Sequence, residues 1–112
     1  MAEHGSFVWN ELATSDVEGA KSFFGELLGW SFRDVDMGHG TYTIVQNAGS
    51  DAAGMMSLDN IEAPGVPPHW TSYIAVDDVD ARTGKVAALG GKVMREPFDI
   101  PNVGRMLSLI HI

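Results

Sequence analysis

The chain contains two related segments, the second displaced from the first by 62 residues. This shift superimposes residues 15–18 on 77–80, Leu27 on Leu89, Gly29 on Gly91 and Arg33 on Arg95. Each segment reads as an extended run, an acidic helix start, an amphipathic stretch and further extended runs. The repeat therefore predicts an α+β domain made of two similar half-repeats, at about residues 6–60 and 68–106.

The first half-repeat predicts the element order βαβββ. Its opening run is rich in aromatic and β-branched residues, which suit a strand. Ser15 and Glu18 have the spacing of a capping box, and Gly29 favours the end of a helix. We expect a helix up to Gly29, a turn at 47–54, and strands at 7–14, 30–34, 41–46 and 55–58.

The second half-repeat predicts the same elements but does not complete them. After a linker at 63–68, we expect a strand at 69–76, a helix at 79–89, a strand at 92–95, a turn at 97–101 and a strand starting at Gly104.

The last six residues, 107–112, are those encoded by the start of a transposase adapter used in sequencing libraries. We therefore expect a non-native tail on a truncated chain, with about 16 residues of the second half-repeat missing. A native strand is the alternative, because polar and apolar residues alternate there.

Composition narrows the possible partners. The 112 residues, 45% of them hydrophobic, are enough for one compact domain. Fifteen acidic and seven basic residues give a net charge of −8, which disfavours nucleic acid and anionic membranes as partners. The sequence has no cysteine and no apolar run that resembles a signal peptide or a membrane span. We expect a cytoplasmic protein that binds a small molecule.

Three segments resemble the vicinal oxygen chelate superfamily, which includes glyoxalase I, bleomycin-resistance proteins and extradiol dioxygenases. They run from Leu12 to Asp16, from Ala20 to Trp30 and from His69 to Ala81, and the similarity extends from about Phe7 to Met106. The resemblance implies paired βαβββ units that form curled mixed sheets around a cleft. It also implies a homodimer when the protein is full length.

The resemblance also implies a divalent metal, with ligands from the opening and last strands of each half. The opening-strand positions hold Trp9 and Thr71 here, and the last strand of the first half offers Met55, Met56 and Leu58. Indole, hydroxyl and thioether groups are poor ligands for such a metal. The fourth ligand position falls in the missing strand. We therefore expect no cofactor, and an ordinary divalent metal centre is the alternative.

Strand alternation places Phe7, Trp9, Glu11 and Ala13 on one face, beside His69, Thr71, Tyr73 and Ala75. The opposite, more aliphatic face should meet the helices. We predict Glu11 as the catalytic residue, because a carboxylate among apolar neighbours can acquire a pKa suited to proton transfer. The alternative is a structural Glu11 that is hydrogen-bonded to Tyr73 or to an arginine.

The other predicted site residues would bind the ligand. They are Trp9, His69, Thr71, Tyr73, Met56 and Arg105. All of them except Thr71 also have a structural interpretation: packing for the aromatic residues and Met56, a rim position for His69, and a surface salt bridge for Arg105. Two functions fit these residues. One is a glyoxalase-like lyase or isomerase without the usual metal, and the other is a bleomycin-resistance-like protein that sequesters its ligand. A third interpretation, a structural or sensory domain without either role, needs only the fold.

Overall fold

The computed structural model describes residues 3–38, 40–60, 65–100 and 104–111. The chain divides into two compact units, Phe7–Ile74 and a smaller unit of Met1–Ser6 with Ala75–Ile112. The expected α+β fold is confirmed: two helices accompany a five-stranded mixed sheet and a two-stranded sheet. The division falls after the opening strand of the second half-repeat, because that strand pairs with the first strand of the chain.

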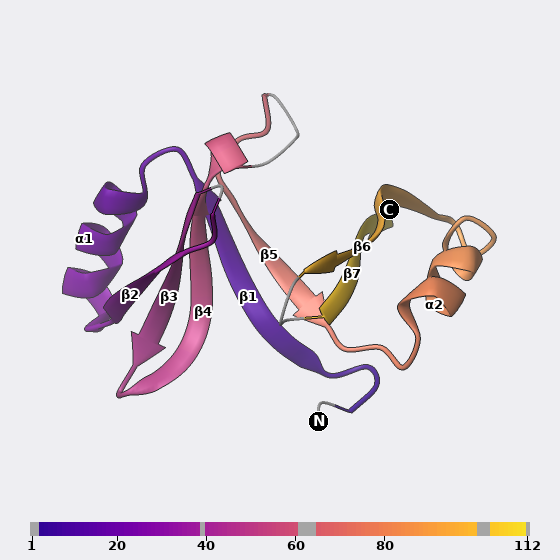
Figure 1. Cartoon of the computed structure of the whole chain (residues 1–112), viewed down its shortest axis with the longest axis horizontal. Helices are drawn as coiled ribbons and strands as arrows, with labels where there is room; N and C mark the ends of the chain where they lie inside the picture. Colours follow the sequence, from indigo (N-terminus) through magenta and orange to yellow (C-terminus); the bar gives the residue numbers. More distant parts are fainter. Residues whose placement is uncertain (1–2, 39, 61–64, 101–103, 112) are drawn as a thin grey trace. The chain divides into compact units, whose positions relative to one another are not determined.

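The larger unit is a curled sheet with one helix along one of its faces (Figure 1). Its strand order is β2-β3-β4-β1-β5. Strand β1 has two partner strands, since it pairs in parallel with β4 and antiparallel with β5. The elements are β1 (Phe7–Thr14), α1 (Val17–Leu28), β2 (Ser31–Asp36), β3 (Thr41–Asn47), β4 (Ser50–Ser57), the short 3-10 helix η1 (Leu58–Asn60) and β5 (His69–Ile74).

Helix α1 begins one residue later than the predicted capping box. Asp16 is the N-cap, and its Oδ1 accepts a hydrogen bond from the Gly19 amide at 2.9 Å. The prediction of a capping box formed by Ser15 and Glu18 was therefore wrong, because Asp16 supplies the hydrogen-bond acceptor that the first turn needs. The other end is as expected: Gly29 adopts the left-handed conformation that closes the helix.

The turn before β4 is much shorter than predicted. Ala48 and Gly49 both have positive φ values, 51° and 85°, and they join β3 to β4 in a two-residue loop. Such loops match the twist of the flanking strands. The expected turn at 47–54 is therefore wrong over most of its length, and β4 begins at Ser50.

The core of the larger unit lies between α1 and the sheet. Its buried side chains are those of Leu12, Val45, Ala53 and Met55, and Ala20, Phe24, Trp30 and Phe32 pack against them. Trp70, opposite Leu12 on β5, makes edge contacts with the Phe24 and Trp30 rings. The expectation that the more aliphatic face of β1 meets a helix is confirmed for this unit.

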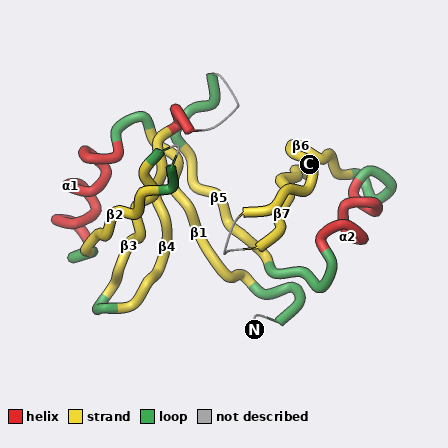
Figure 2. The backbone as a smooth tube through the Cα atoms, in the orientation of Figure 1, coloured by secondary structure: helices red, strands yellow, loops and turns green. Residues whose placement is uncertain are grey.

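The smaller unit contains α2 (Val79–Val86), β6 (Gly91–Ile100) and β7 (Gly104–His111), seen in Figure 2 as one helix and a two-stranded ribbon. Helix α2 is shorter than predicted, because turns follow it from Ala87 to Gly90. Strand β6 continues past Arg95, and Pro97 lies where the ladder is irregular. Because the ladder is already irregular there, the amide hydrogen that proline lacks removes no hydrogen bond between the strands. Residues 97–100 are therefore strand, and the turn predicted over them is wrong. The end of this predicted turn, at residue 101, and the first part of the predicted linker, residues 63–64, lie outside the described residues.

The suspected tail at 107–112 lies largely within β7, where Leu109 pairs with Val93. Its foreign origin stays a prediction, because a foreign segment can pair as a strand too. Neither described helix is long and apolar enough to cross a membrane.

Replacing Met55 with Ala should destabilise the larger unit by about 2–5 kcal/mol, because its side chain is fully buried between sheet and helix. All three tryptophans lie in this unit, so their fluorescence during urea unfolding reports on it. The matched control is Met37→Ala, since Met37 is 40% exposed. It should change stability by less than about 0.5 kcal/mol. Equal losses in the two variants would contradict the assigned core.

Candidate functional site

The predicted site residues of β1 and β5 lie on the sheet face away from α1. We call this surface of the larger unit the distal face; it carries Trp9, Glu11, Tyr42, Met56, Thr71 and Tyr73. The register determines this grouping, because Trp9 lies opposite Tyr73 and Glu11 lies opposite Thr71. Directly paired side chains point to the same side of a sheet.

Glu11 lies at the centre of a hydrogen-bonded network on the distal face. Tyr42 Oη donates to Glu11 Oε2 at 2.8 Å, and Tyr73 Oη donates to Glu11 Oε1 at 2.9 Å. Trp9 Nε1 donates to Tyr42 Oη at 2.8 Å. These side chains are half-buried, and each carboxylate oxygen accepts one phenol. The network therefore holds the carboxylate in one orientation.

Gly54 provides the space that Tyr42 occupies. It lies on β4 directly between Glu11 of β1 and Ile44 of β3. A Cβ atom at this position would collide with Oη and Cζ of Tyr42. A side chain at position 54 would therefore push the phenol away from Glu11.

Both phenols stay protonated well above neutral pH. Burial raises the pKa of Tyr42 most, and the negative charge of Glu11 raises it further, while the hydrogen bond from Trp9 opposes the change. Burial and then the Glu11 charge raise the pKa of Tyr73. Both hydroxyls therefore remain hydrogen-bond donors to the carboxylate.

The structure brings some predicted residues to Glu11 and leaves others apart. Thr71, Met56 and His69 share the distal face with it, and His69 lies at the start of β5 opposite Ala13. The His69 Nδ1 lies 2.8 Å from the Pro67 carbonyl oxygen. Arg105 belongs to the smaller unit, where its guanidinium donates to Asp80 at 2.9 Å and to Asp99 at 3.2 Å. Arg105 therefore forms the salt bridges of its structural interpretation.

Tyr42 is the site residue that the sequence analysis missed. Strand alternation alone puts Tyr42 and Ile44 on one face of β3. It does not reveal that this face is shared with Glu11, because β3 reaches β1 only through β4. The available signal was Gly54, a glycine whose strand position was hidden by the expected turn at 47–54.

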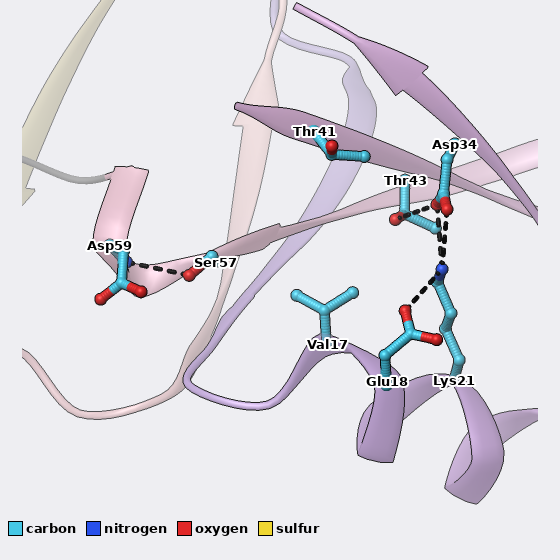
Figure 3. Close-up of a pocket in the computed structure, with 8 residues that line it drawn as sticks. All are labelled: Val17, Glu18, Lys21, Asp34, Thr41, Thr43, Ser57 and Asp59. Atoms are coloured by element: carbon cyan, nitrogen blue, oxygen red, sulfur yellow. Dashed lines mark hydrogen bonds and ion pairs between the residues drawn. The ribbon is translucent and has the colours of Figure 1, made fainter. Parts of the chain in front are cut away.

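A second candidate is an open depression beside α1, outside the distal face (Figure 3). Lys21 lies at its edge and forms ion pairs with Glu18 at 2.9 Å and Asp34 at 3.0 Å. The hydrogen bond to Glu18 raises the pKa of Lys21, and the one from Thr43 lowers the pKa of Asp34. These charged groups already have partners, so the depression is the weaker candidate.

Comparisons with known proteins found a matching family model and similar curated proteins. Residues 6–107 match the model of the Glyoxalase/Bleomycin resistance protein/Dioxygenase superfamily. The chain is 39% identical over 108 residues to CFP32 of Mycobacterium tuberculosis, which carries a provisional glyoxylase name, and 34% identical over 115 residues to the anthracycline biosynthesis protein DnrV of Streptomyces peucetius.

These alignments cover 96% and 91% of this chain, but only 40% of CFP32 and 42% of DnrV. The chain thus spans well under half the length of these relatives. Among solved structures, a glyoxalase I mutant from Zea mays aligns at 21% identity with a TM-score of 0.38, covering 90% of this chain and 40% of the maize chain.

Replacing Gly54 with Ala should break the network by displacing Tyr42. We expect a loss of about 1–3 kcal/mol of stability from overpacking, and a shift of the Trp9 indole N–H signal in NMR spectra. Gly84→Ala is the control, because a Cβ there meets nothing within 4 Å. It should leave the Trp9 signal in place. An unchanged Trp9 signal in Gly54→Ala would contradict the positioning role of Gly54.

Stability should fall at alkaline pH because of the two tyrosines. Their pKa values are raised on folding, so the stability they contribute is complete below the ordinary phenol pKa of about 10 and is lost as the pH rises towards the folded values. Ultraviolet titration of these two tyrosines, the only ones in the chain, measures this directly. In the Glu11→Gln variant both phenols should ionise at a lower pH, since the carboxylate charge that raises their pKa is gone. A folded protein whose phenols titrate near 10 would contradict the network.

Proposed function

Because the chain belongs to the Glyoxalase/Bleomycin resistance protein/Dioxygenase superfamily, we propose that it is part of a glyoxalase-like protein that binds a small molecule on the distal face. The carboxylate of Glu11, held by two phenols, carries this proposal. Small-molecule sites combine apolar walls with a few fixed polar groups, and aromatic rings surround Glu11 here.

We propose that this protein works without the divalent metal of its family. The equivalent positions offer Trp9, whose N–H is engaged as a donor, together with Thr71 and Met56. These donors do not fit a borderline or hard divalent ion. In the parts of the chain that the structure describes, no three residues of the types His, Cys, Asp and Glu gather in a possible metal site.

The first candidate role for Glu11 is proton transfer. Its four lone-pair positions accept only two phenols, so two remain for a ligand. The glyoxylase name of CFP32 suggests the reaction to test first, the isomerisation of a hemithioacetal to a hydroxyacyl thioester. Glu11 would remove the proton from the carbon that bears sulfur and return it to the neighbouring carbonyl carbon, while the hydroxyl proton of the hemithioacetal moves to the former carbonyl oxygen. The two transfers balance, and no oxidant is needed.

The second candidate role is sequestration without reaction. The phenol and indole hydrogens of the network are all engaged within it, so none is directed at an oxyanion. Enzymes that form oxyanions usually stabilise them with such donors. The name of DnrV, an anthracycline biosynthesis protein, adds a flat aromatic compound as a second kind of ligand to test.

The experiment supplies the purified chain with methylglyoxal and glutathione, and follows thioester absorbance. If Glu11 is the base, Glu11→Gln should lower the rate by about 10²–10⁴-fold. Glu26→Gln removes an equal charge from α1 and should leave the rate unchanged. Catalysis that persists in Glu11→Gln would contradict the proton-transfer role. Saturable quenching of tryptophan fluorescence by an anthracycline, without thioester formation, would favour sequestration.

The same preparations test the metal proposal. Elemental analysis of protein purified without chelators should find no stoichiometric Ni, Zn, Mn or Fe. We also propose that the full-length protein is a homodimer, and the test is the mass in solution of that longer protein. A stoichiometric metal that is required for thioester formation would overturn the metal-independent proposal.

A further inference from the structure

Every hydrogen-bond donor of the Glu11 network donates to another member of the network. Each of the hydrogens involved has one acceptor: Trp9 Nε1–H goes to Tyr42, and the hydroxyls of Tyr42 and Tyr73 go to Glu11. An indole N–H and a phenol O–H each supply one hydrogen only. A ligand that approaches the network therefore meets no free hydrogen-bond donor from these four side chains.

What the network still offers are acceptors. Each oxygen of a carboxylate has two lone pairs, and one on each Glu11 oxygen is occupied by a phenol. Among the residues that the structure describes, Tyr73 Oη accepts no hydrogen bond, and Tyr42 Oη accepts one. The surface around Glu11 is thus a cluster of lone pairs on a half-buried anion.

His69 extends this acceptor surface along β5. Its Nδ1 lies 2.8 Å from the Pro67 carbonyl oxygen, and a carbonyl can only accept, so Nδ1 carries the hydrogen. In the neutral ring, Nε2 is then an acceptor as well. Thr71 lies between His69 and Tyr73 on β5, and its hydroxyl can serve in either direction.

Neither the lysine nor the arginine of the larger unit neutralises Glu11. Residues 7–74 contain one of each, Lys21 and Arg33. Lys21 forms ion pairs with Glu18 and Asp34, and Arg33 pairs with Asp51 at 3.6 Å. The carboxylate of Glu11 therefore retains its charge towards a ligand, with aromatic rings on either side.

We propose that the distal face recognises a ligand through an ammonium group, which donates to Glu11 and lies against the rings of Trp9, Tyr42 and Tyr73. The inference rests on the proposed function and names its ligand class. An ammonium supplies only donors, which matches an acceptor-only cluster, and its charge matches the carboxylate. The rings add cation–π attraction at their faces. A carboxylate or phosphate ligand would instead meet lone pairs and a like charge.

Three probes of similar shape test this: phenethylammonium, 2-phenylethanol and 3-phenylpropionate. Each is titrated into the full chain while NMR follows the indole N–H signals, with Trp9→Phe identifying the Trp9 signal. We expect phenethylammonium to shift that signal and to bind at least about 10-fold more tightly than 3-phenylpropionate, because charge-assisted hydrogen bonds are the stronger ones. The neutral alcohol should bind with intermediate affinity.

The variants Glu11→Gln and Glu26→Gln complete the test. Glu11→Gln should abolish the preference for the ammonium, whereas Glu26→Gln, with an equal change in net charge, should keep it. Tighter binding of 3-phenylpropionate, or an ammonium preference that survives in Glu11→Gln, would overturn the inference but leave a ligand-binding face. If none of the three probes shifts the Trp9 signal at saturating concentrations, the distal face is not a ligand surface and the proposed function fails as well.

Discussion

The position of β1 between two partner strands is the constraint on which the rest of the site depends. Strand β1 is hydrogen-bonded in parallel to β4 and antiparallel to β5, so its register is set from both sides. That register puts Glu11 between Gly54 and Thr71. A slip of one residue would turn Glu11 towards α1 and Leu12 away from the core. Burial of Leu12 against Met55 and Phe24 therefore also fixes the direction of the carboxylate.

The pairing of β1 with β5 also explains why the repeat creates a site. Asn10 and Ser72 lie opposite each other, and they are also equivalent residues of the two half-repeats, 62 positions apart. The local two-fold relation between the opening strands passes through this pair. It brings Glu11 close to its own equivalent, Tyr73, which donates to it. A half-buried carboxylate is costly without partners, and here two phenols supply them.

The fold was largely predictable because its signals are local. The period of the apolar residues in α1 and the glycine at its end predicted that helix, and the alternation in β1 separated Leu12 from Glu11. The errors arose where a local signal had two interpretations. Glycine and aspartate in residues 47–54 suggested a long turn, but two positive-φ residues complete it and the rest pair as strand. Pro97 suggested a chain reversal, but it lies at an irregular point of a continuing strand.

The sequence by itself determined the fold class and the face on which Trp9, Glu11 and Tyr73 lie, because periodicity and internal similarity are properties of the chain. Only the tertiary structure decided that Tyr42 joins them, that Gly54 leaves room for its ring, and that the hydrogen-bond donors of the network bind acceptors within the network. These features depend on the register between strands and on the direction of each hydrogen bond. Neither is encoded in any single stretch of sequence, since both arise when distant residues meet across a sheet.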